Sequence, residues 1–432
     1  MTVSSTTPWQ AGPAHLRAVV VGVVAVAGAL LFRSPTLLVL ATPFAIVAVW
    51  STATRPARDP SLVGRVGPPT VREGEATTWT GQLTDAGGVD HVVGVAPLRN
   101  WLEPRPRSGV AVRDVSTVIA SVAIPMRSIR WGRHDLGPIR VACVSTWGAF
   151  RWTARDVGHR VVTLPLPAVF DAAPSSHHSN GLVGLTRSAR PGDGTEFAGL
   201  RPFQSGDRLR RINWRRSLRS GELHVTATYA DQDTHVALFV DAQADFGDSG
   251  GIDGAASSID TSVRAAGAIA EHFLLRGDRV SLRVFGSRVP ASVAPASGRA
   301  HLRRILDALA SIEPPTYRPL QRGAPRGDMV RGDALAIMLS PLVSSTALDW
   351  AISLASHGLT VAVIDTLPGD VHVSDDPSTG LAWRIRLLER RVEMRAVQRV
   401  GIPVLGWDGP GSLDPFLREV ARRASAPRMA RR

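Results

Sequence analysis

Two apolar runs separated by three residues place the strongest constraint on what this chain can fold into. Residues 18–32 read AVVVGVVAVAGALLF and residues 36–50 read TLLVLATPFAIVAVW. Helices that are apolar all round fit lipid better than a soluble core, and a second run directly behind the first argues against a cleaved signal peptide. Each run falls slightly short of the ~20 residues that span a bilayer, although flanking residues can extend both. We therefore predict a two-helix membrane hairpin within residues 1–58.

The arginines around the two runs indicate an orientation. Arg17 precedes the first run, Arg55, Arg58 and Arg65 follow the second, and Arg33 is the one charge in the turn between them. Because basic residues are enriched on the cytoplasmic side, we expect both ends of the hairpin there. This predicts a protein of the cell membrane with the bulk of its chain in the cytoplasm.

Composition excludes several classes of chemistry. All 50 basic residues are arginine, so a phosphate-binding loop with its lysine, Schiff-base chemistry and Ser–Lys catalysis are excluded. Cys143 is the one cysteine of the sequence, which leaves no intrachain disulfide and no cysteine zinc site. The net charge of +13 is weak evidence for a nucleic-acid partner, because arginine in place of lysine is typical of GC-rich coding sequences.

At 432 residues the chain is too long for one ordinary core, and its pattern changes along its length. Residues 60–167 hold short alternating apolar runs with glycine and proline turns, which favour a β-sandwich. We expect its Trp147–Phe150 turn to pack in the core, with stacking on a ligand as the less favoured alternative. Residues 168–193 are linker-like, and residues 425–432 form a basic tail.

Residues 232–424 alternate strand-like and helical runs, which predicts a doubly wound α/β domain with a mostly parallel sheet. The expected strands are 235–242, 279–286, 334–340, 360–366 and 402–407. The expected helices are 257–276, 300–312, 346–357 and 384–400. Ligands of such sheets bind beyond the carboxyl ends of the strands, which here carry Asp241, Ser340, Asp365 and Asp408.

Residues 194–231 form an arginine-rich segment whose first part reads GTEFAGLRPFQSGDRLRRINWRRSLRSGELHV. We expect an extended run, a short helix within 208–220, and a strand at 222–229 that leads into the sheet. Three hypotheses compete for it. It could bind phosphates with Trp214 or Phe203 as stacking platforms, use Glu196 and Asp207 as a hydrolytic acid–base pair, or present a rigid surface to a protein partner.

We favour the third hypothesis. Carboxylates interleaved with the arginines can pair with them, and carboxylates among guanidinium groups have lowered pKa values that do not suit a general acid. We therefore predict no catalytic residues, and expect most of the arginines to be neutralised by acids of the same chain.

The same segment resembles the signature of the bacterial domain of unknown function 58 family. That signature runs Gly-x-Glu-Phe, Leu-Arg-x-Tyr, Gly-Asp, Arg-x-Ile-Asp-Trp and Ser-x-Arg-x-Gly-x-Leu. The matching residues are Gly194, Glu196, Phe197, Leu200, Arg201, Gly206, Asp207, Arg211, Ile212, Trp214, Ser217, Arg219, Gly221 and Leu223. Phe203 replaces the tyrosine, and Asn213 stands in place of the aspartate.

The resemblance implies a membrane-tethered protein with a β-rich segment and a domain of the von Willebrand factor A type, a Rossmann-like α/β fold. Such proteins are often encoded beside AAA+ ATPases of the MoxR type and transglutaminase-like proteins, which implies an assembly or chaperone-like role with the ATPase. As partner-interface residues we predict Glu196, Arg201, Asp207, Arg211, Trp214, Ser217 and Arg219.

The resemblance also raises the question of Mg²⁺. A von Willebrand A domain binds this ion through Asp-x-Ser-x-Ser after its first strand, with Thr and Asp from other loops. Here Asp241, Gln243 and Asp245 occupy the first motif without its serines, and Ser340-Pro341 stands where relatives commonly show Ser-Asp. An oxygen shell from Asp241, Gln243 and Asp245 is one hypothesis, and a strand-end aspartate with no metal is the other.

Overall fold

The computed structural model describes residues 5–115, 119–166, 191–204, 207, 209–229, 235–289, 291–313, 334–371 and 376–412. The basic tail and most of the expected linker lie outside these residues. The chain divides into two compact units. The first holds residues up to Leu166 together with Gly251–Gly254, and the second holds the remainder.

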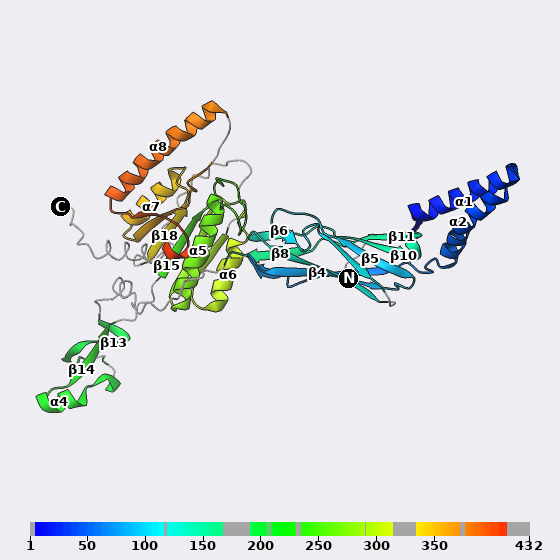
Figure 1. Cartoon of the computed structure of the whole chain (residues 1–432). Coiled ribbons are helices and arrows are strands. Elements are labelled where there is room, and N and C mark those ends of the chain that lie inside the picture. Colours follow the sequence, from blue (N-terminus) through cyan, green and yellow to red (C-terminus); the bar gives the residue numbers. More distant parts are fainter. Residues whose placement is uncertain are drawn as a thin grey trace. The chain divides into compact units, whose positions relative to one another are not determined.

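The N-terminal helices of the first unit are α1 (Pro13–Leu31) and α2 (Pro35–Ala53), which lie against each other (Figure 1). Both are 19 residues long and apolar enough to cross a membrane. Only 22% and 11% of their most apolar windows are buried, so neither is a core helix of the described structure. Both begin earlier than the predicted 18–32 and 36–50, because proline suits the first turn of a helix.

Strand β1 (Ser5–Ala11) precedes the hairpin and corrects its predicted extent, because residues 1–58 are not all membrane hairpin. It pairs antiparallel with β11 (Phe150–Arg155), and the Gly12 amide donates to the Ala149 carbonyl at 2.7 Å. The Trp9 indole donates to the carbonyl of Arg58 at 3.0 Å. Both ends of the hairpin are thereby hydrogen-bonded to the β-rich part of this unit.

The rest of the first unit consists of three sheets, with orders β1-β11-β10-β5-β7, β2-β4-β8-β6 and β3-β12-β9. The remaining strands are β2 (Ser61–Gly67), β3 (Thr70–Arg72), β4 (Ala76–Thr84), β5 (Val89–Val95), β6 (Leu102–Pro104), β7 (Val110–Asp114), β8 (Ala120–Ser128), β9 (Gly132–Asp135), β10 (Arg140–Ser145) and β12 (Arg160–Leu164).

One core joins the two larger sheets, as in a sandwich. Trp79 and Ile124 of the four-stranded sheet share it with Cys143 and Trp152 of the five-stranded sheet, and all four are fully buried. Burial alternates along the strands, which explains the alternating sequence pattern. The expectation for the 147–150 turn is wrong in part, because Ala149 and Phe150 are buried whereas Trp147 is exposed.

The arginine-rich segment of the second unit folds as a small module. Strands β13 (Pro191–Pro202) and β14 (His224–Tyr229) pair antiparallel, and between them lie η2 (Leu209–Arg211) and α4 (Trp214–Ser220). We call residues 191–229 the signature module. Its two strands form a sheet of their own, so the expectation that residues 222–229 lead into the larger sheet is wrong.

The larger sheet of the second unit has the order β17-β16-β15-β18-β19-β20, and neighbouring strands are parallel except at the β17 edge. The strands are β15 (His235–Asp241), β16 (Arg279–Phe285), β17 (Ala291–Ala296), β18 (Leu335–Ser340), β19 (Thr360–Asp365) and β20 (Val404–Gly406). Five of them lie within predicted runs, whereas β17 was not predicted.

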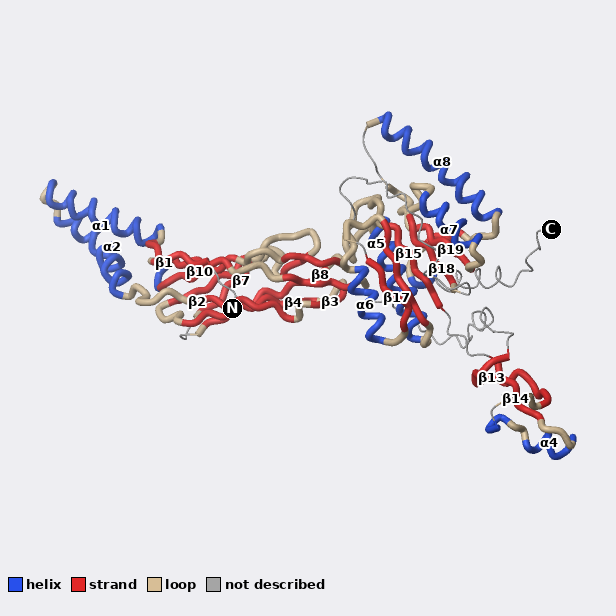
Figure 2. The backbone as a smooth tube through the Cα atoms, turned by 180° about the vertical axis from the view of Figure 1, so that it is seen from behind, coloured by secondary structure: helices blue, strands red, loops and turns tan. Residues whose placement is uncertain are grey.

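Helices cover both faces of this sheet (Figure 2). They are α5 (Ser258–Leu275), α6 (Arg299–Leu309), α7 (Thr346–Ser356) and α8 (Pro377–Arg399). Ala237 and Phe239 of β15 share a core with Trp350 of α7 and Val397 of α8. Since strand side chains alternate, the residues between them point to the opposite face, where α5 packs on β15, β16 and β18. Burial on both faces explains the continuous apolar run of β15.

Candidate functional site

The loop of the signature module is closed by an ion pair between Arg201 and Asp207. The two terminal nitrogens of Arg201 donate to the two carboxylate oxygens of Asp207 at 2.7 and 2.6 Å. The backbone N–H of Gln204 donates another hydrogen bond to the same carboxylate at 2.8 Å. The hydrogen bonds from Arg201 and then from Gln204 lower the pKa of Asp207. Asp207 is therefore an ionised structural anchor, poorly suited to act as a general acid.

Three residues seat the helix α4 on β14. The Asn213 side chain accepts from the Arg216 amide at 3.0 Å and caps the helix, and Gly221 ends it in a left-handed conformation with φ of 74°. The Ser217 hydroxyl is buried, donates to the Asn213 carbonyl, and accepts from the His224 amide at 2.9 Å. Ser217 is thus a structural residue of the module and not a surface for a partner.

The outer face of α4 presents apolar and basic side chains together. Trp214 is 60% exposed and Leu218, one turn later, is 83% exposed. Arg215, Arg216 and Arg219 are exposed beside them, and within the described residues no acid pairs with any of the three. We call Trp214, Arg215, Arg216, Leu218 and Arg219 the α4 face.

This arrangement bears only in part on the expectation that acids of the chain neutralise most of the arginines, which stays a prediction because Arg208 and the side chain of Arg210 are not described. Arg201 is paired, and Arg211 lies close enough to Asp207 to lower its pKa. The arginines of the α4 face remain available. The side chains of Glu196, Arg208 and Arg210 lie outside what the structure describes, so the Glu196–Asp207 pair stays a prediction.

A second cluster lies where β15 and β18 end side by side. These central strands mark the point where the chain order of the sheet reverses, which is where open α/β sheets commonly bind ligands. The Ser340 hydroxyl donates to Asp241 at 2.7 Å, and the backbone N–H of Gln243 donates to the other oxygen of Asp241 at 3.0 Å. Burial raises the pKa of Asp241 to about 6 despite these bonds.

Groups of the chain already engage both carboxylates of the residues predicted for Mg²⁺. Asp245 accepts from the Ser258 hydroxyl and the Ile259 amide at the start of α5, which ties its carboxylate to the helix. Among the described residues no group of three or more His, Cys, Asp or Glu could hold a metal ion. A hard cation needs several oxygen ligands at once, and these hydrogen bonds compete with that role, so the oxygen shell of Asp241, Gln243 and Asp245 stays a prediction.

Arginines of α8 fasten the same edge of the sheet. The buried Arg390 donates to the carbonyl of Pro341 at 2.9 Å and to the carboxylate of Asp365. Arg386 donates to the Val343 carbonyl at 2.7 Å and pairs with Glu393. Protein cations therefore position the loop after β18, and one of them neutralises Asp365.

Helix α8 also presents an apolar stripe that the sequence prediction missed. Leu381, Ile385, Leu388 and Val392 are exposed, and their spacing of four, three and four residues places them on one helix face. Arg390 and Val397 are buried. The periodic signal was present in the sequence, but periodicity does not tell which apolar face of a helix meets the sheet.

Residues 199–397 match a family model described as "Protein of unknown function DUF58". The matched region begins within β13 and ends near the end of α8. It therefore contains the α4 face, the strand ends around Asp241 and the α8 stripe, but neither the hairpin nor the sandwich-like sheets.

Among curated proteins, the chain is similar to uncharacterized proteins of Mycobacterium tuberculosis (Rv1480) and Mycobacterium bovis (Mb1516). Each is 27% identical over 202 residues, which cover 43% of this chain and 59% of the relative. The chain thus spans about three fifths of the length of these relatives. A solved cupredoxin domain of amoB from Nitrosocaldus yellowstonii shows 8% identity over 25% of this chain and 88% of that one, with a TM-score of 0.17, too slight to establish a shared fold.

Proposed function

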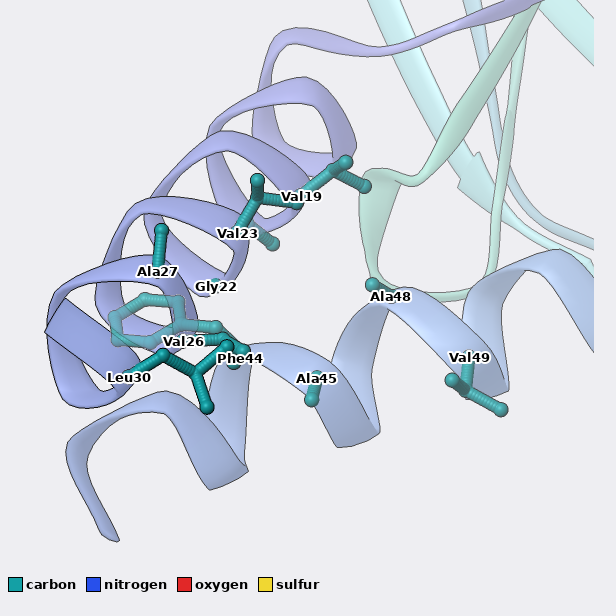
Figure 3. A pocket seen from close by; sticks show the side chains of 11 residues that line it. Val19, Gly22, Val23, Val26, Ala27, Leu30, Phe44, Ala45, Ala48 and Val49 are labelled. Carbon is teal, nitrogen blue, oxygen red and sulfur yellow. The ribbon is translucent and has the colours of Figure 1, made fainter. Parts of the chain in front are cut away.

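We propose that this is a membrane-anchored protein that binds a protein partner and performs no catalysis itself. Helices α1 and α2 would form the anchor in the cell membrane, with the bulk of the chain in the cytoplasm. An open groove of about 460 Å³ between them supports the anchor (Figure 3). Its lining includes Val19, Val23, Val26 and Phe44 and is apolar throughout, so it suits hydrocarbon better than water.

The α4 face is the observation that carries the partner-binding proposal. Tryptophan and arginine are enriched among residues that dominate protein interfaces, and here they stand exposed on one short helix. The structural residues Asn213, Ser217 and Gly221 hold that helix in place, so the face is presented by a preorganised support. Preorganisation reduces the entropy that binding must overcome.

The family resemblance suggests which partner to test first. We propose an AAA+ ATPase of the MoxR type, in an assembly or envelope-related process. The sheet order, with its antiparallel β17 edge, supports a von Willebrand A-like domain as the companion binding element. The α8 stripe gives the same region a second surface that an interacting protein could cover.

A pull-down with the full-length chain tests this proposal. The protein, held in detergent, is incubated with an AAA+ ATPase of the MoxR type, with and without Mg²⁺ and ATP. We expect capture by the wild type and strong loss with Trp214→Ala or Arg219→Glu. Leu98→Ala serves as the control, because Leu98 is an exposed apolar residue of the first unit. Equal capture by all variants would show that the α4 face is not the interface.

The unpaired arginines keep the binding of nucleic acid or another anionic surface as the alternative. Phosphate contacts release counterions, so such binding must weaken steeply as salt rises. Titrating single-stranded DNA at increasing salt would reveal this behaviour. A steep salt dependence abolished by Arg215→Ala and Arg219→Ala would favour the alternative over a protein partner.

A hydrolase using Glu196 and Asp207 is the second alternative. The lowered pKa of Asp207 counts against it as an acid. Hydrolysis that Asp207→Asn abolishes while folding and partner binding stay intact would reverse this ranking.

Cysteine labelling tests the orientation of the hairpin in the membrane, since a label in the Arg33 turn should react from outside intact cells whereas one after α8 should not.

A further inference from the structure

Trp147 stands in a conformation that the surrounding structure must impose. It is 58% exposed, and its backbone has φ of 57° and ψ of 20° within the turn Thr146–Gly148. Bulky residues rarely adopt positive φ, because Cβ then approaches the backbone. An aromatic side chain that is both strained and exposed adds nothing to the core, which raises the question of what it faces.

The turn that carries Trp147 abuts the start of α1. The Gly12 amide donates to the Ala149 carbonyl at 2.7 Å, and a Cβ at Gly12 would lie 2.4 Å from the Gly148 carbonyl oxygen. Pro13 begins α1 at the next position. The residues just after Trp147 are therefore in contact with the residue just before the apolar helix.

Helix length then fixes the level of that contact. At 1.5 Å per residue, 19 residues reach about 28 Å, close to the ~30 Å hydrocarbon core of a bilayer. A hairpin of two such helices leaves little apolar length to spare. In the proposed anchor, Pro13 and Ala53 therefore lie near the lipid–water boundary, and Gly12 with the Trp147 turn lies beside it.

The neighbouring side chains suit that boundary. The guanidinium of Arg55 lies 5.3 Å from the centre of the Phe150 ring, and the buried His15 bonds Ser51 at 2.7 Å across the two helices. Arg17, Arg55 and Arg58 are exposed, and no acidic residue occurs before Asp59. Arginines attract anionic headgroups, and tryptophan favours the interfacial layer, where its ring is half apolar and its N–H can hydrogen-bond.

We propose that Trp147 inserts into the headgroup layer of the membrane and seats the sandwich-like part of the first unit on the bilayer, with the arginines at the base of the hairpin beside the lipid phosphates. This rests on the proposed membrane anchor. The strain at Trp147 is then explained by its task, because the left-handed turn leaves the indole exposed next to the residues that contact Gly12 at the start of the hairpin.

Fluorescence quenching of site-specific labels tests whether Trp147 inserts into the headgroup layer. The full-length protein is placed in nanodiscs of phosphatidylcholine and phosphatidylglycerol, with the dye NBD attached at Trp147→Cys, Leu98→Cys or Val23→Cys in separate samples. Cys143 stays unlabelled, since it is fully buried and burial raises the pKa of its thiol to about 12. Leu98 is the matched control, because it is 66% exposed and lies away from the hairpin. Strand β5 begins next to Gly88, which contacts Pro56 just after the hairpin, and Leu98 follows the opposite end of that strand.

At Trp147→Cys we expect loss of quenching by aqueous iodide and gain of quenching by headgroup-labelled spin lipid, with the reverse at Leu98→Cys. Val23→Cys, in the middle of α1, should be quenched by spin label deep in the acyl chains. If the label at Val23→Cys is quenched by deep spin label while the label at Trp147→Cys is still quenched by iodide, Trp147 does not insert into the headgroup layer, although the membrane anchor is supported. If the label at Val23→Cys is not quenched by deep spin label, helix α1 does not span the membrane, and both the anchor and the insertion of Trp147 are wrong. Equal thermal unfolding of the three variants verifies that each is folded.

Discussion

The hydroxyl of Ser340 donates a 2.7 Å hydrogen bond to the carboxylate of Asp241, although 99 positions separate the two residues in the chain. The bond links the ends of β15 and β18, the strands between which the order of the sheet reverses. Asp241 is fully enclosed, and the two hydrogen bonds it accepts do not outweigh the cost of burying its charge. Its protonation is therefore coupled to folding.

This coupling predicts a pH dependence of stability. The pKa of Asp241 rises from 3.8 to about 6 on folding, so between these values the unfolded chain releases a proton that the folded chain keeps. Stability from this group is therefore lost as pH rises through that window, by about 3 kcal/mol in total. Denaturant unfolding of Asp241→Asn should show a flatter dependence between pH 4 and 7 than the wild type. Asp248→Asn, an exposed carboxylate in the same loop, should keep the wild-type slope, and an unchanged slope in Asp241→Asn would contradict the assignment.

A second prediction concerns Arg390, the buried guanidinium that joins Asp365 to the loop after β18. Arg390→Gln leaves Asp365 without its counter-charge and frees the Pro341 carbonyl, which should cost about 3 kcal/mol of unfolding free energy. Arg391→Gln is the control, because Arg391 is exposed at the next position and should change stability by less than about 0.5 kcal/mol. Denaturant titration of both variants compares them. Equal midpoints would show that the Arg390 contacts contribute nothing.

The carboxylates at and after the ends of β15 and β19 lead to a prediction about Mg²⁺, namely that the ion does not change thermal stability. A ligand that binds the folded state raises the unfolding temperature, and the rise grows with its concentration. Because the carboxylates of Asp241, Asp245 and Asp365 are each engaged by groups of the chain, adding Mg²⁺ or a chelator should leave the melting temperature unchanged. A melting temperature that climbs with Mg²⁺ and returns with chelator would revive the oxygen-shell hypothesis.

Local pattern was enough to predict the hairpin, the alternating strands and the strand–helix alternation of the C-terminal part, because each has a period readable within a dozen residues. Strand β1 escaped prediction because what makes it a strand is its pairing with β11, about 145 residues away. Strand β17 is a short edge strand containing Pro295, and its sequence ASVAPA carries no alternation.

The candidate site was harder to predict than the fold. Motif matching selected Arg201, Asp207, Trp214 and Ser217 together, yet the structure separates them into an ion-pair anchor, a buried hydroxyl and an exposed indole. Which arginines are paired depends on side-chain directions that a linear sequence does not contain. Trp147 illustrates the same difficulty. Its aromatic character predicts a core position, but its left-handed backbone conformation leaves it exposed.

The role assigned to Ser217 predicts local destabilisation without loss of the displayed face. Ser217→Ala removes the acceptor of the His224 amide and the donor to the Asn213 carbonyl, which should cost about 1–2 kcal/mol in the signature module. Hydrogen exchange should then quicken in α4 and β14. Arg219→Ala, on the exposed side of the same helix, should leave exchange unchanged while weakening partner capture. The opposite pattern would exchange the structural and binding roles of these two residues.

The last prediction concerns two facing glycines of the sandwich-like sheets. Gly64 of β2 pairs with Gly81 of β4, and the Trp79 indole donates to Asp156 at 2.7 Å beside them. A Cβ at Gly64 would fall 1.9 Å from the Asp156 carboxylate, and one at Gly81 would fall 2.4 Å from the Trp79 ring. Asp156 cannot yield easily, because His159 also bonds the same oxygen at 2.6 Å.

Overpacking at such a site should destabilise the first unit by about 3 kcal/mol in Gly64→Ala and by a similar amount in Gly81→Ala. Gly87→Ala supplies the control, because a Cβ there meets nothing within 4 Å and the change should be close to neutral. Tryptophan fluorescence during denaturant unfolding reports the difference, since Trp79 and Trp152 are fully buried in this core. If Gly64→Ala unfolded at the same denaturant concentration as Gly87→Ala, the structure must adjust enough to admit a methyl group at Gly64. The Asp156 carboxylate would then not be held rigidly by its hydrogen bonds to Trp79 and His159.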